Sequence, residues 1–355
     1  MSVVLGANQY GKAEVRLVRV DRDSPRHRLT DLSITSQLRG DFAATHLVGD
    51  NSGVIATDTQ KNTVYAFARD GIGAPESFLA RLARHFLARP QVTGGRWAAE
   101  QYGWDRIGGG PVPAAPDATA TDTTGTDATA APDATGHDHS FVRSGGERRT
   151  ALVHAGASAD GTPQLTVLSG LRDATLLKST GSEFHGFPRD RYTTLPEATD
   201  RILATDVTAW WRYTDDFAAE ALAAGDGGAA FDARYDAVRA ILLETFAGLH
   251  SLALQQTVFA MGKAVLDAYP EIAEIRLSCP NNHHFLVDLE PFGLDNPGEV
   301  FFAADRPYGL IEAAVTRADD EAGAGPGGGS GGEVPGAPAG PRPEHPVWAT
   351  IGGFV

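Results

Sequence analysis

A short polar turn between two apolar, β-branched runs carries side chains that could take part in catalysis or binding. Residues 48–68, VGDNSGVIATDTQKNTVYAFA, bring together Thr57, Asp58, Lys61 and Asn62. Hydroxyl, carboxylate, ammonium and amide groups hydrogen-bond substrates and exchange protons, so this turn is a candidate site. A solvated loop is the alternative. Similar polar turns at Lys12 and at residues 281–284 favour the site.

Composition and charge limit the classes of function. The chain has 355 residues, enough for two domains with sizeable cores, and 42% of them are hydrophobic. Its formal net charge is −15. This charge argues against nonspecific nucleic-acid binding, which needs clustered Lys and Arg. An anionic small substrate would need a local cationic pocket.

The cysteine content and the ends of the chain predict a cytoplasmic protein. Cys279 is the single cysteine, so the chain can form neither an intrachain disulfide nor a thiolate metal cluster. The N-terminus lacks the pattern of a signal peptide, and IGGFV at the C-terminus is not a peroxisomal address. No apolar run approaches the roughly 18 residues of a membrane span, so no membrane partner is expected.

Two segments have a composition unsuited to a packed core. Residues 108–136 are almost entirely Gly, Pro, Ala, Asp and Thr, and residues 322–343 are dominated by Gly, Pro and Ala. Both are expected to be disordered or loop-like and to carry no chemistry. The first is expected to interrupt a hairpin in the N-terminal half.

Hydrophobic periodicity predicts the elements of the first half. Residues 12–17 alternate as a half-buried strand, and residues 54–56 and 63–68 read as strand ends around the polar turn. Residues 75–89 have helical period, with Phe78, Leu82 and Phe86 on one face. Residues 141–153 return to strand character.

The second half repeats this order of strands, helices and strands. Strand character covers residues 164–178, helical spacing covers 235–249 and 254–269, and short strands at 275–277 and 285–289 flank a polar segment. The pattern predicts an α+β protein whose antiparallel sheets carry helices on one face.

Common cofactor motifs are absent from the sequence. It contains no G-x-G-x-x-G after a strand, no P-loop and no H-E-x-x-H. His137, Asp138 and His139 could bind a metal ion, but they border the low-complexity segment, and a solvated loop is the favoured interpretation.

Five segments resemble those of urate oxidase, the cofactor-free uricase, in its bacterial type. They are NQYGKAEVRL (8–17), ATDTQKNTVY (56–65), LKSTGSEFHGFPRDRYTTL (177–195), DRILATDV (200–207) and PNNHHFLVDL (280–289). They occur in family order and extend the resemblance over residues from about 5 to 315.

The resemblance implies a fold, an assembly and a reaction. The fold is the tunnelling fold (T-fold), with one unit in residues 1–150, a second in 151–315 and a Gly/Pro-rich tail in 316–355. Four chains would form a homotetrameric barrel around a central tunnel, with active sites at subunit interfaces. Urate would be oxidised by O2 to 5-hydroxyisourate and H2O2 without a metal or organic cofactor, as a step of purine catabolism.

The resemblance also implies which residues bind urate. Phe184 matches the aromatic ring that stacks on the purine, and Arg201 matches the arginine that clamps it. Gln255 matches the glutamine that grips the other edge of the ring. Leu254 lies where a backbone N–H contacts the substrate. Asn281 matches the residue that holds O2 or water.

The implied catalytic residues are Lys12, Thr57 and His283. The resemblance also makes Thr57 and Asp58 substrate-binding residues, and it places them on the neighbouring subunit relative to the substrate clamp. A lysine acts as a base only in its neutral form, which burial and nearby cations favour. If residues 281–285 are extended, Asn281 and His283 share one face.

Two other classes of function are weighed against this one. A pterin or purine hydrolase of the same fold would use zinc or a cysteine nucleophile, for which Cys279 is the sole candidate. A binding or scaffold protein would have kept the fold and lost the chemistry.

Overall fold

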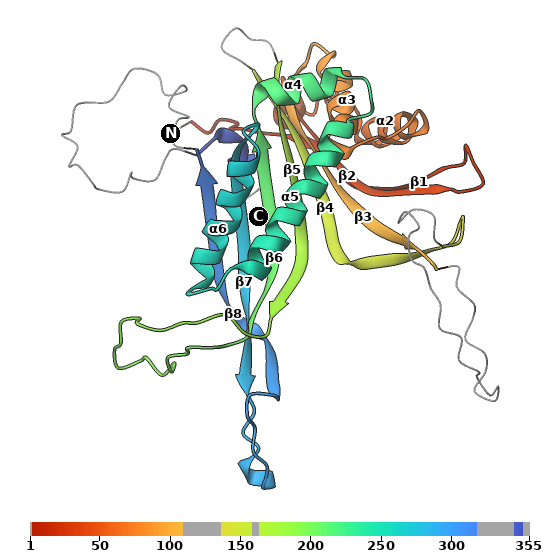
Figure 1. Cartoon of the computed structure of the whole chain (residues 1–355). Coiled ribbons are helices and arrows are strands. Elements are labelled where there is room, and N and C mark those ends of the chain that lie inside the picture. Colours follow the sequence, from red (N-terminus) through yellow and green to blue (C-terminus); the bar gives the residue numbers. More distant parts are fainter. Residues whose placement is uncertain (1, 109–135, 158–162, 318–343, 351–355) are drawn as a thin grey trace.

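A computed structural model of the chain describes residues 2–108, 136–157, 163–317 and 344–350 (Figure 1). Nearly all of both low-complexity segments, at 108–136 and 322–343, lies outside the described residues, so the expectation that they are loop-like stays untested.

The strands form one eight-stranded sheet in which each strand pairs antiparallel with the next along the chain. They are β1 (Tyr10–Asp21), β2 (Arg28–Gly40), β3 (Val92–Arg106), β4 (Phe141–Ala157), β5 (Pro163–Lys178), β6 (Leu203–Tyr213), β7 (Ile272–Leu286) and β8 (Phe301–Thr316). β1 and β8 are therefore the two edges of the described sheet.

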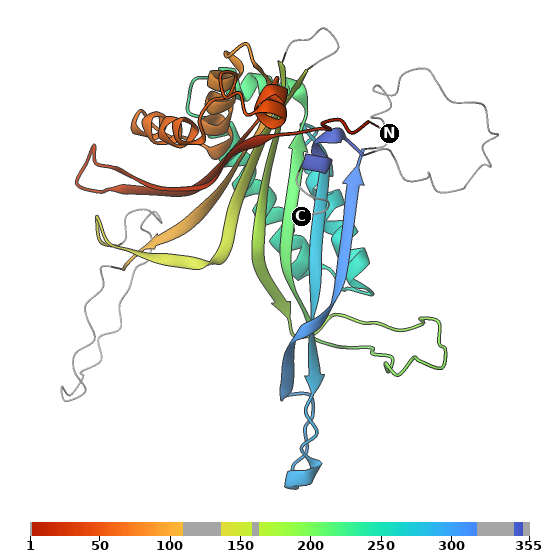
Figure 2. The same ribbon diagram turned by 180° about the vertical axis from the view of Figure 1, so that it is seen from behind.

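The longer helices cover one face of this sheet (Figures 1 and 2). They are α2 (Thr57–Arg69), α3 (Pro75–Leu87), α4 (Asp215–Ala223), α5 (Ala229–Gly248) and α6 (Leu254–Ala268). The short helix α1 (Ala43–Val48), between β2 and α2, has no buried residue. Helix α2 packs on β1, α3 on β3 and β4, and α6 on β7 and β8. The opposite face is called the open face below. It carries the short 3-10 helix η3 (Pro346–Thr350), whose Val347 and Trp348 pack against Leu152 and Leu168.

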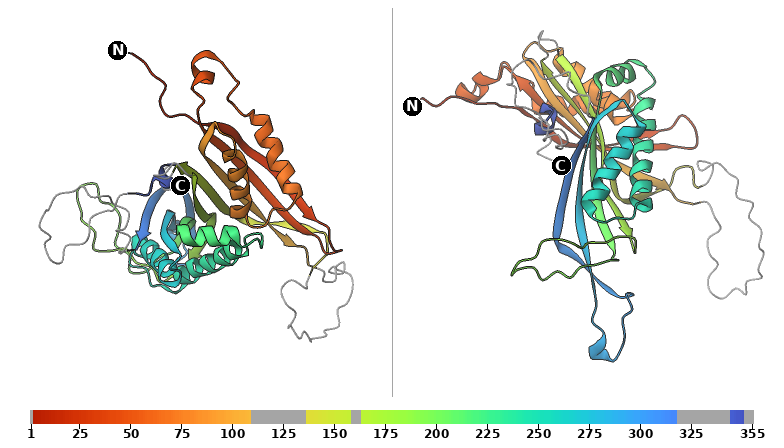
Figure 3. Two further views of the ribbon diagram at one scale, coloured as in Figure 1. Left: turned by 90° about the horizontal axis from the view of Figure 1, so that it is seen from above. Right: turned by 60° about the vertical axis from the view of Figure 1, so that its left-hand side comes forward.

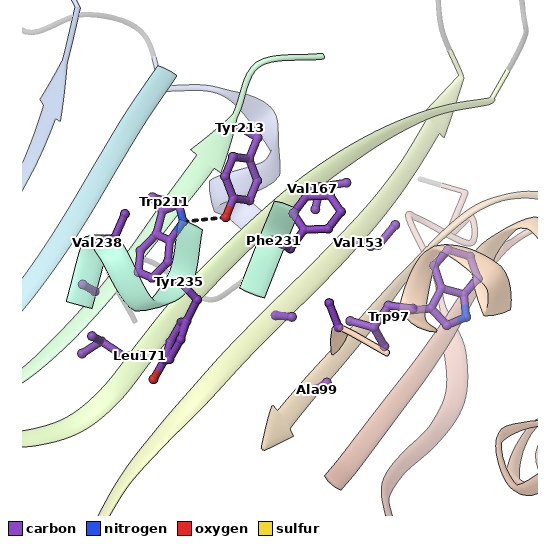
Figure 4. Packing of buried hydrophobic residues seen from close by; sticks show 14 of the residues in the cluster. Trp97, Ala99, Val153, Val167, Leu171, Trp211, Tyr213, Phe231, Tyr235 and Val238 are labelled. Carbon is purple, nitrogen blue, oxygen red and sulfur yellow. Dashed lines mark hydrogen bonds between the residues drawn. The ribbon is translucent and has the colours of Figure 1, made fainter. Parts of the chain in front are cut away.

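Alternation along the strands builds the core between sheet and helices. Trp97, Val153 and Trp211 point toward the helices and are fully buried (Figure 4). Phe231 of α5 packs edge-on against Tyr213, their ring centroids 5.3 Å apart. The alternation predicted for residues 12–17 belongs to this pattern, with Val15 and Leu17 buried in β1.

Several predicted elements are confirmed. Helix α3 matches the prediction for residues 75–89, and α5 and α6 match the two helices predicted in the second half. Residues 109–135 do interrupt a hairpin, because Arg106 at the end of β3 pairs with Phe141 at the start of β4. The antiparallel sheet with helices on one face is also confirmed, whereas the division at residues 150 and 315 stays a prediction.

The interpretation of residues 57–68 as a turn followed by a strand is wrong. Helix α2 begins at Thr57, and residues 54–56 precede it outside any strand. Gln60, Val64 and Ala68 are buried at four-residue intervals, so packing against β1 outweighs the strand preference of the β-branched residues.

The polar segment at residues 278–284 is also not a break between two strands. Strand β7 runs without interruption from Ile272 to Leu286. Its pairing with β8 changes register between Asn281 and His283, whose partners are Gly309 and Ala304. The irregularity lies in the pairing and not in the continuity of the strand.

A buried ion pair joins α3 to the middle of the sheet. The Glu76 carboxylate, in the first turn of α3, accepts a hydrogen bond from the Ser169 hydroxyl and pairs with Arg149 Nη2 at 2.8 Å. Arg149 also pairs with the more exposed Asp232 at 2.6 Å. Glu76 itself is fully buried.

Glu76→Ala is expected to lower the free energy of unfolding by about 3 kcal/mol, because it leaves a largely buried guanidinium short of its buried counter-charge. Asp232→Ala removes the exposed partner of the same guanidinium and is expected to cost less than about 1 kcal/mol. Urea denaturation of both variants measures the difference. Equal losses would contradict a dominant role for Glu76.

Candidate active site

Strand β1 and the start of α2 bring Lys12 and Thr57 to the same place. The Tyr10 hydroxyl accepts a hydrogen bond from the Ile55 N–H at 2.7 Å and donates one to the Ile55 carbonyl at 3.1 Å. This contact fixes the chain two residues before Thr57 against the strand that carries Lys12. The strand that carries Lys12 and the helix that begins at Thr57 are therefore held against each other.

The first turn of α2 carries the third member of this group. Asp58 accepts hydrogen bonds from Lys61 and from Asn62. The hydrogen bond from Lys61 is the largest cause that lowers the Asp58 pKa, and Lys12 adds a smaller electrostatic contribution. Asp58 is thus held as a carboxylate close to Lys12, and the free N–H groups at the helix start favour anions. We call Lys12, Thr57 and Asp58 the β1 cluster.

A second group is built on the loop between β5 and β6. The backbones of Ser182 and Ser251 form an isolated parallel β-bridge, which ties this loop to the α5–α6 connection. The Glu183 N–H donates a hydrogen bond to the Ser251 carbonyl at 2.7 Å. Phe184 bonds through its backbone to Ala198 across the loop. These contacts hold Phe184 near the start of α6.

Arg201 ends the same loop beside the Phe184 ring. The guanidinium carbon lies 5.2 Å from the ring centroid. Burial lowers the Arg201 pKa, and the buried Nε has no hydrogen-bond partner among the described residues. A half-buried cation with an unused donor next to an aromatic face suits a flat anion.

The start of α6 distinguishes two neighbouring glutamines. Leu254 is the first helical residue, so its N–H has no partner within the helix. The Gln256 side chain accepts a hydrogen bond from the Leu252 N–H at 2.9 Å. Gln255 is exposed and has no hydrogen bond recorded among the described residues. Gln255 is therefore the glutamine available to a ligand.

The polar side chains of β7 also divide into hydrogen-bonded ones and ones without a hydrogen bond. Asn282 donates to Asp206 at 2.8 Å, and His284 Nδ1 contacts the Asn282 carbonyl at 3.2 Å. Asn281 and His283 have no side-chain hydrogen bond recorded within the described chain. The rings of His283 and Phe285 lie 5.9 Å apart, as expected for alternate residues of an extended strand.

The two groups lie far apart within one chain. The β1 cluster is at one edge of the sheet, whereas Phe184, Arg201, Leu254, Gln255, Asn281 and His283, here called the β7 cluster, belong to its other half. Figures 1 and 3 place α2 and the β5–β6 loop on opposite sides of the molecule. Within one chain, the two groups of expected site residues are therefore separated.

Comparison with known proteins identifies the family. The sequence model of the family described as uricase matches residues 8–154 and 167–312. The chain belongs to the uricase family. It is 52% identical to the uricase of Arthrobacter globiformis over 353 residues, which cover 99% of this chain and 96% of that protein. The uricase of Cyberlindnera jadinii is 33% identical, with 89% and 98% covered.

Solved uricase structures agree with this assignment. The crystal structure of the Arthrobacter globiformis uricase matches with a TM-score of 0.77, covering 98% of this chain and all of that one. A uricase from Bacillus fastidious matches with a TM-score of 0.68 at 26% identity, covering 88% and 94%. The five motifs predicted the uricase family, its fold class and urate oxidase activity. All three predictions are confirmed.

The alternative of a zinc enzyme requires a group of metal-ligating side chains. No group of three or more His, Cys, Asp or Glu side chains suited to a metal ion occurs among the described residues. Asp138 is paired with Arg26 at 3.3 Å, in keeping with the solvated-loop interpretation of residues 137–139.

No helix in the described ranges is long and apolar enough to span a membrane.

Cys279 is fully buried on β7, and burial raises the pKa of its thiol to about 12. A protonated, enclosed thiol is not a nucleophile. Cys279→Ala is therefore expected to leave turnover of urate unchanged, as measured by steady-state kinetics. Loss of activity in a variant that keeps its native assembly would contradict this prediction.

The structure adds residues that the sequence did not single out. Tyr10 positions the β1 cluster, and Glu183 contacts both His185 and His250 beside Phe184. Tyr10 and Ile55 are 45 positions apart, and Glu183 and His250 are 67 apart. No local pattern signals such contacts, although Tyr10 and Glu183 lie inside the quoted family segments.

Proposed function

We propose that the chain oxidises urate with O2 and water to 5-hydroxyisourate and H2O2, in the cytoplasm and without a metal ion or organic cofactor. The observation that carries the proposal is Arg201, whose buried Nε has no hydrogen-bond partner among the described residues and whose guanidinium carbon lies 5.2 Å from the centroid of the Phe184 ring. The Phe184 ring is itself stacked on Phe187, with the ring centroids 5.0 Å apart. A planar anion with carbonyl groups along its edge satisfies both side chains at once.

The β7 cluster binds the substrate. Urate enters as an anion, stacks on Phe184 and receives the paired donors of Arg201 at one edge. The Gln255 amide holds the other edge, and the Leu254 N–H adds a backbone donor. The net charge of −15 repels anions from the surface as a whole, so this local cation decides binding.

The β1 cluster removes a proton. Lys12 takes a proton from bound urate through the Thr57 hydroxyl, which leaves a dianion with enough electron density to reduce O2 directly. Single-electron transfer and radical recombination form a peroxide, and water adds at C5 as H2O2 leaves. Two electrons and two protons thus pass from urate and water to O2. Asn281 holds O2 or water, and His283 relays protons.

A second copy of the chain completes each site in this proposal. β1 and β8 are unpaired edges of the described sheet, and edges of this kind are available for pairing with another chain. Leu286, Phe302 and Leu310 are exposed near the β8 edge. Closure of such sheets through these edges is consistent with a homotetramer around a tunnel.

The test of the proposal is an aerobic assay of chelator-treated protein. The near-ultraviolet absorbance of urate is followed while H2O2 is measured in parallel. We expect urate loss with one H2O2 formed per urate and no stimulation by added metal. Activity that vanishes on chelation and returns with one metal ion would contradict the cofactor-free reaction.

A further inference from the structure

Two arginines without acidic partners lie on the open face of the sheet, the face opposite to helix α2. Arg39 is on β2 and Arg96 on β3, and Arg96 is paired in register with Gln37 on one side and His154 on the other. The neighbours of Arg39 and Arg96 in sequence, Leu38 and Trp97, point into the core, so both arginines point to the open face.

Their recorded contacts are all with neutral or basic groups. Arg39 Nη1 lies 3.3 Å from His154 Nε2, and its Nε donates to Gln9 at 3.1 Å. Arg96 Nη1 donates to Gln37 at 3.0 Å. Neither arginine forms an ion pair with any of the described residues.

The surroundings of Arg39 and Arg96 make the two neighbouring positive charges electrostatically unfavourable when no ligand is bound there. Burial lowers the Arg96 pKa, and the charge of Arg39 lowers it further. Burial, together with Arg39, His345 and Arg96, lowers the His154 pKa to about 4, so the ring is neutral near pH 7. The buried Nε of Arg96 has no hydrogen-bond partner within the described chain. Like charges thus meet here with no counter-charge recorded.

Other arginines of the open face are arranged differently. Arg148 and Arg172 both pair with Glu100 at 2.9 Å. Arg143 pairs with Asp31 at 3.2 Å. Acidic partners are therefore common on this face, although Arg212, which also points to it, has no ion pair with the described residues and a buried Nε without a hydrogen-bond partner.

A hollow on the open face leaves room beside Arg96. Its volume is about 570 Å³, and Thr150, Thr208 and Trp210 contribute to its lining. The Thr150 hydroxyl is buried and has no hydrogen-bond partner among the described residues. Glu14 and Glu100 also line the hollow, and Glu100 is neutralised by its two arginines.

We propose that Arg39 and Arg96 form a binding site for a tetrahedral oxyanion, either free phosphate or sulfate or the phosphoryl group of a small molecule. Two guanidinium groups present the planar donors that match such oxygens, and the anion supplies the missing counter-charge. The neutral His154 ring gains a proton and becomes a further donor when the anion binds.

Isothermal titration of the assembled, full-length protein with inorganic phosphate at constant ionic strength tests the site. We expect a Kd of about 1 mM or tighter. Arg96→Gln is expected to weaken binding by about tenfold or more, since it removes a charge-assisted contact. Arg143→Gln makes the same change at a paired arginine of the same face and should leave the Kd unchanged.

A third variant separates this site from the urate site. Arg201→Gln should keep phosphate binding, whereas loss of binding in this variant and not in Arg96→Gln would overturn the proposal. An absence of phosphate and sulfate binding to the unaltered protein would also overturn it. Glycerol 3-phosphate in place of phosphate tells a phosphoryl site from one that accepts only the free ion, and binding of either that depends on Arg96 supports the proposal.

Proton uptake gives a second readout. Sulfate does not titrate near pH 5, so protons that leave the buffer when sulfate binds at about that pH are taken up by the protein. We expect uptake by the unaltered protein that is lost in His154→Gln. Binding without proton uptake would contradict the assignment of His154 to the site.

Discussion

Lys12→Met is expected to lower kcat for urate oxidation by about 10²–10⁴-fold, with a much smaller change in urate affinity. The size follows from the loss of a positioned proton-transfer group. Affinity is retained because the substrate clamp, Phe184 and Arg201, lies in the other half of the sheet. Steady-state kinetics, together with equilibrium binding of urate under anaerobic conditions, separate the two effects.

Lys263→Met is the matched control. Lys263 is an exposed lysine of α6 that pairs with Asp267, and its replacement should leave kcat unchanged. Near-normal turnover of Lys12→Met would remove Lys12 from the proton-transfer step. A large rise in KM with unchanged kcat would instead assign Lys12 to binding.

Arg201→Gln is expected to raise KM for urate by about 100-fold, because two charge-assisted hydrogen bonds are lost from a half-buried position. The effect on kcat at saturating urate should be smaller, since the proton-transfer groups are intact. Initial rates over a wide range of urate concentration measure both constants.

Arg201→Lys refines this prediction. This variant keeps the positive charge and loses the planar guanidinium group with its paired N–H donors. Its KM for urate should therefore fall between those of the unaltered protein and of Arg201→Gln. Arg191→Gln, a change in the same loop at an exposed arginine that contacts Tyr192, serves as a control. An unchanged KM in Arg201→Gln would contradict the clamp.

The sequence predicts helices well where side-chain periodicity and burial agree. Helix α3 is predicted because Phe78, Leu82 and Phe86 recur on one face and all three are buried. Helix α2 is missed because Thr63, Val64 and Tyr65 suggest a strand, and the helical burial of Gln60 and Val64 depends on packing against β1. Tertiary contacts overrule local preference here.

The family segments predict which residues belong to the site. Local sequence patterns do not predict where in the folded chain each of these residues lies. Strand pairing decides where each segment lies, and the order of strands along the sheet sends Lys12 and His283 to different halves. The engagement of Gln256 and Asn282 in hydrogen bonds, which leaves Gln255 and Asn281 available, likewise depends on contacts that only the folded chain contains.

The central claim is that each active site takes its proton-transfer group from one copy of the chain and its substrate clamp from another. Mixed tetramers of Lys12→Met and Arg201→Gln chains, made by co-expression and isolated with two affinity tags, test it most directly. Neither chain carries both halves intact. Random mixing through symmetric interfaces should nevertheless rebuild about a quarter of the sites and restore roughly that share of turnover. Mixed tetramers no more active than the two parent variants would contradict the claim and place the whole site within one chain.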